Sequence, residues 1–170
     1  MPKKRPLAPP YMSRLFSVAL AKESLRSGTI ASLVMMAPGF LFKAMGSRVG
    51  HYGPKLGELL FGESSPMLLF AQHLVIGWLS AVPLLLLFSF TQATSLILVG
   101  ATYGIAYYVL VNSLALPLIF GDPMPWQLGL EFILPSLIVH IVYGASIGFT
   151  ARGYAQTLRQ GVPPLDRSQP

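Results

Sequence analysis

The chain has 170 residues, of which 53% are hydrophobic and only 11% are charged, and its net charge is +6. A soluble domain needs roughly 25% charged residues to cover its surface, so the composition excludes an ordinary soluble domain and predicts a membrane protein. The absence of cysteine excludes disulfides, thiolate metal sites and covalently attached c-type haem. Most Lys and Arg residues lie in the two ends, beside apolar segments. We therefore expect them to meet lipid head groups and not nucleic acid.

Four apolar stretches are long enough to cross a bilayer, whose hydrocarbon core of about 30 Å requires about 20 helical residues. They cover residues 28–45, 67–90, 96–120 and 130–150. The first is the shortest, carries Lys43 near its end and contains Pro38, which can kink a helix. The sequence therefore predicts an all-α polytopic membrane protein, with a domain over residues 28–150 whose four transmembrane helices form two hairpins.

A cleaved signal peptide is the competing interpretation of the first stretch. Its basic region would have to extend to Arg26, and no small-x-small cleavage site follows before Lys43. We therefore expect the first helix to be retained.

The basic residues also predict the orientation, because short flanks rich in Lys and Arg stay in the cytoplasm. Residues 1–27 hold six Lys or Arg and residues 151–170 hold three. The loop over residues 46–66 holds two, and the loop over residues 121–129 holds none. Both termini are therefore predicted to be cytoplasmic, with these two loops on the outer side.

The two ends are expected to differ in structure. Residues 1–27 form a basic cytoplasmic segment in which apolar residues recur at helical spacing, namely Met12, Leu15, Phe16, Ala19 and Leu20. This pattern predicts a short amphipathic helix in the membrane interface. Residues 151–170 are rich in Pro and Gln and show no periodicity beyond Tyr154, so they are predicted to be a disordered cytoplasmic tail.

A short motif occurs twice, as His73-Leu-Val-Ile-Gly77 in the second stretch and His140-Ile-Val-Tyr-Gly144 in the fourth. Small residues four positions apart let membrane helices approach closely. We therefore expect a set of glycines to form helix-packing faces inside the bundle: Gly77, Gly100, Gly104, Gly144 and Gly148.

Polar side chains inside a bilayer are costly and are therefore candidates for function. The four that we single out are Gln72, His73, Asn112 and His140. One interpretation is a b-type haem held between His73 and His140 as axial ligands. The other needs no cofactor: each histidine hydrogen-bonds across the bundle to Asn112, to Tyr107 or to a backbone carbonyl near Pro135. Both interpretations stay open from the sequence.

Catalytic motifs are missing, because the chain has no Ser-x-x-Lys, nucleophile elbow, His-Glu-x-x-His or phosphate-binding glycine loop. Three methionines and His51 offer donors that copper prefers, but they do not form a run with ligand spacing, so no metal site is predicted. We therefore expect a non-enzymatic accessory or scaffold component of a membrane assembly. Its partners would be lipid and other membrane subunits or a second copy. The alternatives are a haem-binding redox protein and a small solute or ion transporter.

Several segments resemble one known family. They are Gly28-Thr-Ile-Ala-Ser-Leu-Val-Met-Met36, His51-Tyr-Gly-Pro-Lys-Leu-Gly57, His73 with Gly77, Pro117-Leu-Ile-Phe-Gly121 and His140-Ile-Val-Tyr-Gly144-Ala-Ser-Ile-Gly148. Over residues 28–150 the chain is similar to the YagU-like four-helix membrane proteins of prokaryotes, a family defined as a domain of unknown function. The resemblance implies a compact protein of the prokaryotic inner membrane, and it implies no activity or cofactor.

Overall fold

The computed structural model describes residues 18–47, 49–91, 93 and 95–160, and this part of the chain is all-helical, without a strand. The elements are α2 (Val18–Ala44), α3 (Tyr52–Phe61), α4 (Pro66–Phe90), α5 (Leu96–Tyr107), η1 (Tyr108–Ala115), α6 (Leu116–Phe120), α7 (Pro125–Leu128), α8 (Leu130–Thr150) and α9 (Arg152–Gln160). Four helical segments are long and apolar enough to cross a membrane: α2, α4, α8 and the continuous run α5–η1–α6. This confirms an all-helical fold with four helices that are long and apolar enough to cross a membrane.

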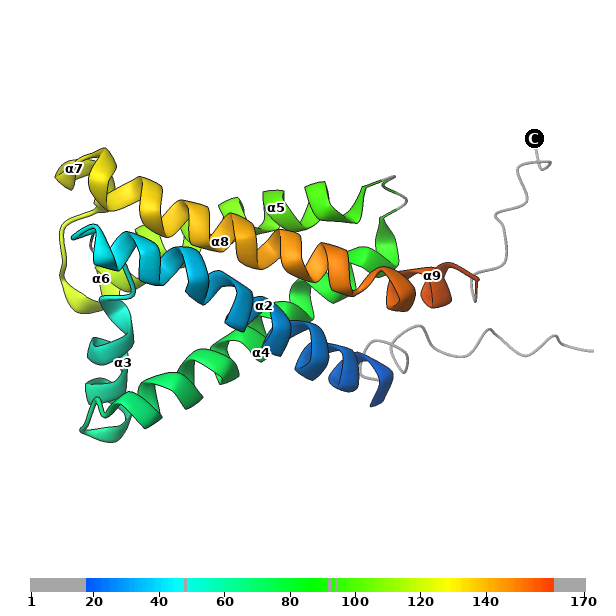
Figure 1. The fold of residues 1–170 in the computed structure, drawn as a ribbon, viewed down its shortest axis with the longest axis horizontal. Coiled ribbons are helices and arrows are strands. Elements are labelled where there is room, and N and C mark those ends of the chain that lie inside the picture. Colours follow the sequence, from blue (N-terminus) through cyan, green and yellow to red (C-terminus); the bar gives the residue numbers. More distant parts are fainter. Residues whose placement is uncertain (1–17, 48, 92, 94, 161–170) are drawn as a thin grey trace, which may run out of the picture.

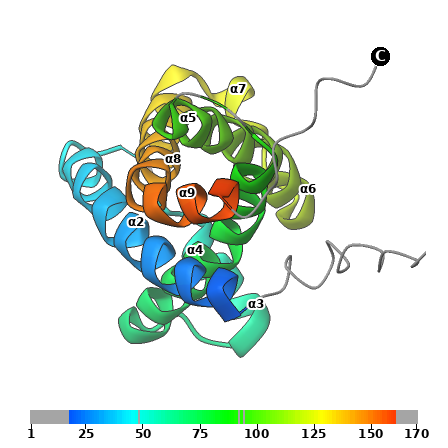
Figure 2. The ribbon, with the colours of Figure 1, turned by 90° about the vertical axis from the view of Figure 1, so that its right-hand side faces the viewer.

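Helix α8 lies at the centre of the bundle (Figure 1). Helix α5 packs along one side of α8, and α2 packs on the other side and also contacts α4. Figure 2 shows the same arrangement from the end where α9 lies, with α5 above α8 and with α2 and α4 below it. In Figure 1, α4 diverges from the other helices toward the end of the bundle that carries α3. The bundle is therefore closed near α9 and splayed near α3.

The first long helix begins ten residues before the predicted apolar stretch. Helix α2 runs without a break from Val18 to Ala44, through Pro38. Its buried residues Leu20, Ser24 and Ala31 recur at helical spacing, which explains why the helix extends beyond the membrane-length segment. Of the predicted interfacial helix, Ala19 and Leu20 belong to α2, and Met12, Leu15 and Phe16 lie outside the described residues.

Residues 151–170 were predicted to be disordered, and this prediction is wrong for residues 152–160, which form helix α9. The residues Ala151, Tyr154, Ala155 and Leu158 are spaced by three and four positions, and Ala151 and Ala155 are fully buried. Helix α9 contacts α4 and α8 through this stripe, and burial against a neighbour stabilises a helix whose sequence is otherwise polar. Residues 161–170 lie outside the described part of the chain.

The glycines of α5 and α8 bring these helices into backbone contact. A Cβ added at Gly100 would overlap the carbonyl oxygen of Gly144, and a Cβ at Gly144 would overlap that of Gly100. The same close approach recurs for Gly104 against the His140 carbonyl and for Gly148 against the Leu96 carbonyl. Helices α2 and α4 cross in a similar way, because a Cβ at Gly77 would overlap the Ser32 hydroxyl. Small residues thus set the distance between helices at both interfaces.

The third membrane-spanning segment changes its helical geometry before Pro117. A proline ring clashes with the carbonyl four residues earlier, here that of Ser113, and removes one N–H donor. The eight residues Tyr108–Ala115 form a π-helix, in which the N–H of Leu116 donates to the carbonyl of Val111, five residues back. The π-helix rotates the side chains after Tyr108 relative to an ideal α-helix, and Asn112 lies in this part.

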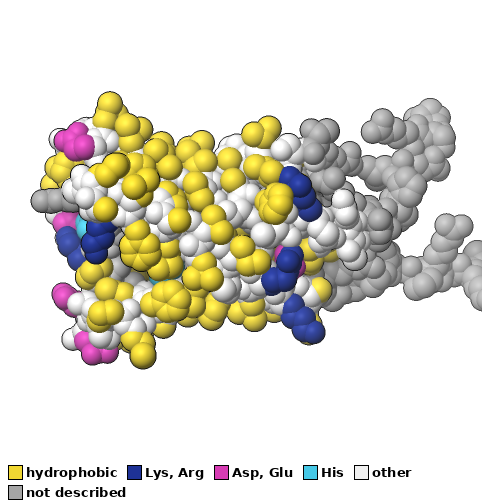
Figure 3. Space-filling view, in the orientation of Figure 1, with side chains coloured by type: hydrophobic (Ala, Val, Ile, Leu, Met, Phe, Trp, Pro, Cys, Tyr) yellow, Lys and Arg dark blue, Asp and Glu magenta, His cyan; other side chains and the backbone are white. Residues whose placement is uncertain are grey.

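Charge is distributed unevenly between the two ends of the bundle (Figure 3). Among the described residues, the end with α3 and α7 carries four acidic residues and two lysines: Glu58, Glu63, Asp122, Glu131, Lys43 and Lys55. The end where α2 begins and α8 finishes carries Lys22, Arg26 and Arg152 with one acidic residue, Glu23. An apolar belt covers the surface between them, as expected for a membrane-spanning bundle.

Candidate functional site

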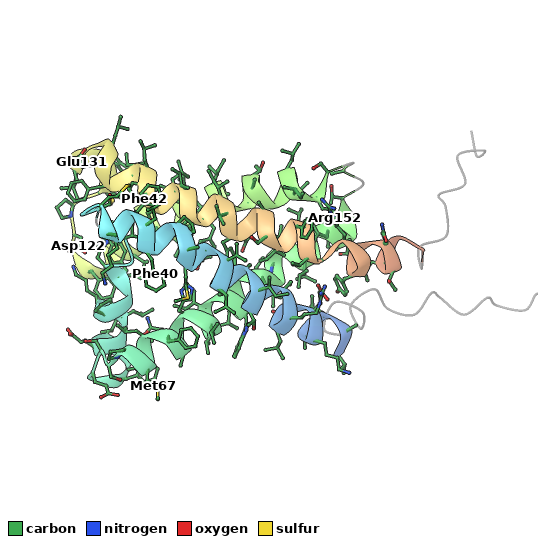
Figure 4. All side chains as sticks on the ribbon, viewed as in Figure 1. Phe40, Phe42, Met67, Asp122, Glu131 and Arg152 are labelled. Carbon is green, nitrogen blue, oxygen red and sulfur yellow. The ribbon has the colours of Figure 1, made fainter. Side chains whose placement is uncertain are left out.

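A cavity of about 720 Å³ lies between the four long helices in the splayed half of the bundle. Helices α2 and α4 touch at Gly28 and Gly77 and diverge from there toward α3, which leaves space between them. The walls are mostly apolar, with contributions from Met35, Met36, Phe40, Phe70, Ile76, Val111, Phe132 and Val139. Figure 4 shows the labelled Phe40 projecting from α2 toward α3, at the open side of this space. The opposite half of the bundle is closed by fully buried Leu84, Leu85, Phe88 and Ile147.

The four polar residues singled out in the sequence, Gln72, His73, Asn112 and His140, all line this cavity. They come from α4, η1 and α8. The splayed helices therefore bring residues that are up to 68 positions apart, from Gln72 to His140, to the wall of one cavity.

His140 has hydrogen-bond partners at both ring nitrogens. Its Nδ1 lies 2.6 Å from the carbonyl oxygen of Ser136, and its Nε2 lies 2.9 Å from the Asn112 amide nitrogen. A carbonyl can only accept, so Nδ1 carries the proton, and Nε2 of a neutral ring accepts from Asn112. The ring also stacks on Tyr107, with centroids 5.7 Å apart, and contacts Tyr108 at 5.8 Å. His140 is therefore held in one tautomer and one orientation.

His73 and Gln72, which are adjacent on α4, bind two different neighbours. The Nε2 of His73 donates to the carbonyl oxygen of Ser32 on α2 at 3.0 Å, across the widening gap between these helices. The Gln72 amide nitrogen donates to the carbonyl of Gly53 on α3 at 3.1 Å. These two bonds tie the splayed end of α4 to the rest of the fold.

The predicted haem site requires a change at His140. Iron ligation through its Nε2 would displace Asn112, because that nitrogen already accepts the Asn112 hydrogen bond. The two histidines do line one cavity, as such a site needs. Haem binding stays a prediction.

Hydrogen bonds from three tyrosines join the helices at and below the cavity. Tyr107 was considered in the sequence only as a partner of the histidines, and Tyr103 and Tyr143 were not singled out. The Tyr143 hydroxyl donates to the carbonyl of Gly77, and the Tyr103 hydroxyl donates to the carbonyl of Ser80 at 2.6 Å. The Ser80 hydroxyl donates to Tyr107 at 3.0 Å. The available sequence signal was the spacing of four between Tyr103 and Tyr107 on an apolar helix, together with the tyrosine inside the His-x-Val-x-Gly motif.

Helix α3 covers the end of the cavity and is fixed by an ion pair. The Lys55 ammonium lies 2.6 Å from Asp122, which follows α6, and its nitrogen also lies 5.7 Å from the Phe120 ring centroid. Burial and the negative charge of Asp122 raise the pKa of Tyr52, also on α3, to about 12. Gly50 and Gly62 have positive φ of 74° and 73° and allow the sharp turns at both ends of α3. Helix α3 is thus the cover of the cavity, and it is held in place by one ion pair and bounded by two glycine turns.

Neutralising Asp122 is expected to loosen this cover only slightly. The chain has no cysteine, so a Ser136→Cys variant places a single thiol in the cavity wall. Because Lys55 and Asp122 are partly exposed, their pairing contributes at most about 1 kcal/mol, and Asp122→Asn should raise the rate of thiol labelling by at most about fivefold. The control is Glu23→Gln, which removes the Glu23–Arg26 pair at the other end. Equal acceleration by both variants would contradict the role of the cover.

No family model, no curated protein and no solved structure matches the chain. The resemblance to YagU-like proteins stays a prediction. The site is therefore interpreted from its own residues and geometry.

Proposed function

We propose that the chain is a non-enzymatic membrane protein that binds a small, mostly apolar molecule in the cavity between its four long helices. The observation that carries the proposal is the cavity itself. Its volume of about 720 Å³ falls in the range of about 300–1,000 Å³ typical of small-molecule sites. Apolar walls with a few converging polar groups, here the histidine, asparagine and glutamine side chains, are also typical of such sites.

The proposed location is the prokaryotic inner membrane, with both termini in the cytoplasm. The charge distribution supports this orientation, because the end with Lys22, Arg26 and Arg152 has the excess of basic residues expected on the cytoplasmic side. The acidic end with α3 and α7 then faces outward. In this orientation the cavity lies in the outer half of the bilayer.

Binding is favoured over an accessory role that uses the small-residue faces. The glycines of α5 and α8 contact each other, and Gly77 contacts α2. These small-residue faces are therefore already covered by helices of the same chain and are not free to bind a partner. Binding is also favoured over transport, because the cavity ends at the closed half around Leu84, Phe88 and Ile147. Haem is a second candidate occupant, supported by His73 and His140 lining the same cavity.

The test is to identify what the protein retains when it is purified in mild detergent from its native membrane. We expect the wild type to release a small molecule in roughly equimolar amount, measured by mass spectrometry of an organic extract. Gly39→Leu should release several-fold less. Gly39 lines the cavity and a Cβ there would meet only Val139 at 3.9 Å, so a leucine side chain fills the cavity without breaking the helix interface.

The matched control is Gly153→Leu. Gly153 lies on α9, outside the cavity, and a Cβ there would meet no atom of the described chain within 4 Å. Equal release from both variants and the wild type would locate the molecule elsewhere and contradict the proposal. A Soret band that disappears in the Gly39→Leu variant would identify the molecule as haem.

A further inference from the structure

We propose that the ligand of this cavity is an uncharged amphiphile with a flat, oxygen-substituted ring, the chemistry of a membrane quinone or quinol. Its ring would lie among the aromatic residues, and its apolar tail would leave between α2 and α4 into the outer leaflet. This inference rests on the proposed function and names the class of molecule that the site accepts. Three features of the cavity carry it: aromatic walls, the near absence of charge and buried polar atoms without partners.

Aromatic side chains from several helices line the cavity. Phe70, Tyr107, Tyr108 and Phe132 line it from three of the four spanning segments. Tyr107 and Tyr108 already hold the His140 ring in stacked and tilted geometry, with interplanar angles of 20° and 49°. Aromatic side chains favour offset-stacked or edge-to-face contact with another ring, so such walls suit a flat ligand ring.

The cavity offers almost no charge to a ligand. Among the described residues that line it, Lys43 is the one side chain with a permanent charge, and it is exposed at the end of α2. The deeper groups are amides, hydroxyls and imidazoles. His140 is satisfied as a neutral ring by Ser136 and Asn112. A charged group placed deep in the cavity would therefore be buried without an opposite charge, which is strongly unfavourable.

Three buried polar atoms have no hydrogen-bond partner within the described part of the chain: Ser32 Oγ, Gln72 Oε1 and Tyr108 Oη. Their residues line the cavity and are each at least nine-tenths buried. The Gln72 amide nitrogen donates to Gly53, so its oxygen can only accept and requires a donor such as a quinol hydroxyl. The Tyr108 hydroxyl can donate to a carbonyl oxygen of a quinone. Unpartnered buried polar atoms are rare in folded proteins, and a ligand with oxygen substituents would satisfy Gln72 and Tyr108. Ser32 Oγ instead packs against Gly77 where α2 and α4 cross.

The tail has a path into the lipid. Phe40 is 62% exposed and lines the cavity where α2 and α4 diverge, one helical turn from Lys43. In the proposed orientation this opening faces the outer leaflet. An apolar tail anchored by a polar ring can therefore remain in the bilayer while the ring occupies the cavity.

The decisive variant is Tyr108→Phe, because it removes a hydroxyl that makes no hydrogen bond within the described protein. The probe is a benzoquinone with a decyl tail, added in its oxidised and reduced forms to protein in lipid nanodiscs. Trp78 does not line the cavity but follows Gly77, which does, and it reports binding by fluorescence quenching in a Trp126→Phe background. We expect Tyr108→Phe to weaken binding about tenfold, while the thermal stability without ligand is unchanged or higher.

The matched control is Tyr103→Phe. Its hydroxyl donates to the Ser80 carbonyl and does not line the cavity, so the variant should lose stability but keep its affinity within about twofold. Unchanged affinity in Tyr108→Phe would overturn the assignment of the ring site. Dodecanol or dodecanoate binding as tightly as the quinone would overturn the ligand class.

The outcomes also separate this inference from the proposed function. If dodecanol or dodecanoate binds the wild type as tightly as the quinone and does not bind Gly39→Leu, the cavity is a binding site and only the quinone assignment fails. If no probe binds and no molecule is released from the native membrane preparation, the proposed function fails and this inference fails with it.

Discussion

Replacing Gly144 with leucine is expected to lower the free energy of unfolding by about 3 kcal/mol or more, the largest effect of any single substitution that we predict. Its Cβ would overlap the carbonyl oxygen of Gly100. That atom belongs to the backbone of α5, so a side-chain rotation cannot relieve the overlap and the two helices must separate. Because α5 and α8 share the largest interface of the fold, their separation removes packing along most of the bundle.

The measurement is the midpoint of unfolding by sodium dodecyl sulfate in mixed micelles, followed by circular dichroism. Gly39→Leu and Gly153→Leu carry the same chemical change at positions where a Cβ meets nothing closer than 3.9 Å, and we expect both to stay near the wild-type midpoint. Gly100→Leu should resemble Gly144→Leu, since the overlap is reciprocal. If Gly144→Leu unfolded at the midpoint of Gly39→Leu, the backbone contact between α5 and α8 would not exist in the membrane.

The spanning helices were predictable because the membrane imposes a local rule on sequence. A run of about 20 apolar residues is visible without knowledge of its neighbours, and the boundaries of α4, α8 and the α5–η1–α6 run agree with the sequence to within one residue. Helix α9 could also have been found from its stripe of Ala151, Tyr154, Ala155 and Leu158. The prediction missed this helix because it judged residues 151–170 by their overall proline and glutamine content.

The cavity could not be predicted, because it depends on how two helices cross. Ser32 and Gly77 bring α2 and α4 together at one point, and the space beyond that point depends on the crossing angle, which no local pattern encodes. The sequence did predict that a histidine could hydrogen-bond to Asn112 across the bundle, and His140 does so. Helix rotation was not predictable, because the π-helix over Tyr108–Ala115 shifts Asn112 away from the position that an ideal α-helix would give it.

Asn112→Leu is expected to lower the free energy of unfolding by about 1–2 kcal/mol, the second largest effect that we predict. The change keeps a similar volume but removes the amide that lies 2.9 Å from His140 Nε2. The imidazole is half-buried beside Tyr107 and Tyr108, and its Nε2 would lose its partner. The same titration with sodium dodecyl sulfate measures the loss. A midpoint equal to that of the wild type would show that this hydrogen bond does not form in the membrane.

A double-mutant cycle tests whether the effect belongs to the Asn112–His140 pair. His140→Leu alone removes the imidazole and leaves the Asn112 amide without this bond. The double variant Asn112→Leu/His140→Leu leaves neither polar group behind, so its loss should be smaller than the sum of the two single losses by about 1 kcal/mol. Additive losses would mean that each residue acts through other neighbours, such as Ser136. Strong coupling would instead show that Asn112 and His140 bond to each other in the membrane, and this bond fixes the ring orientation that a ligand meets.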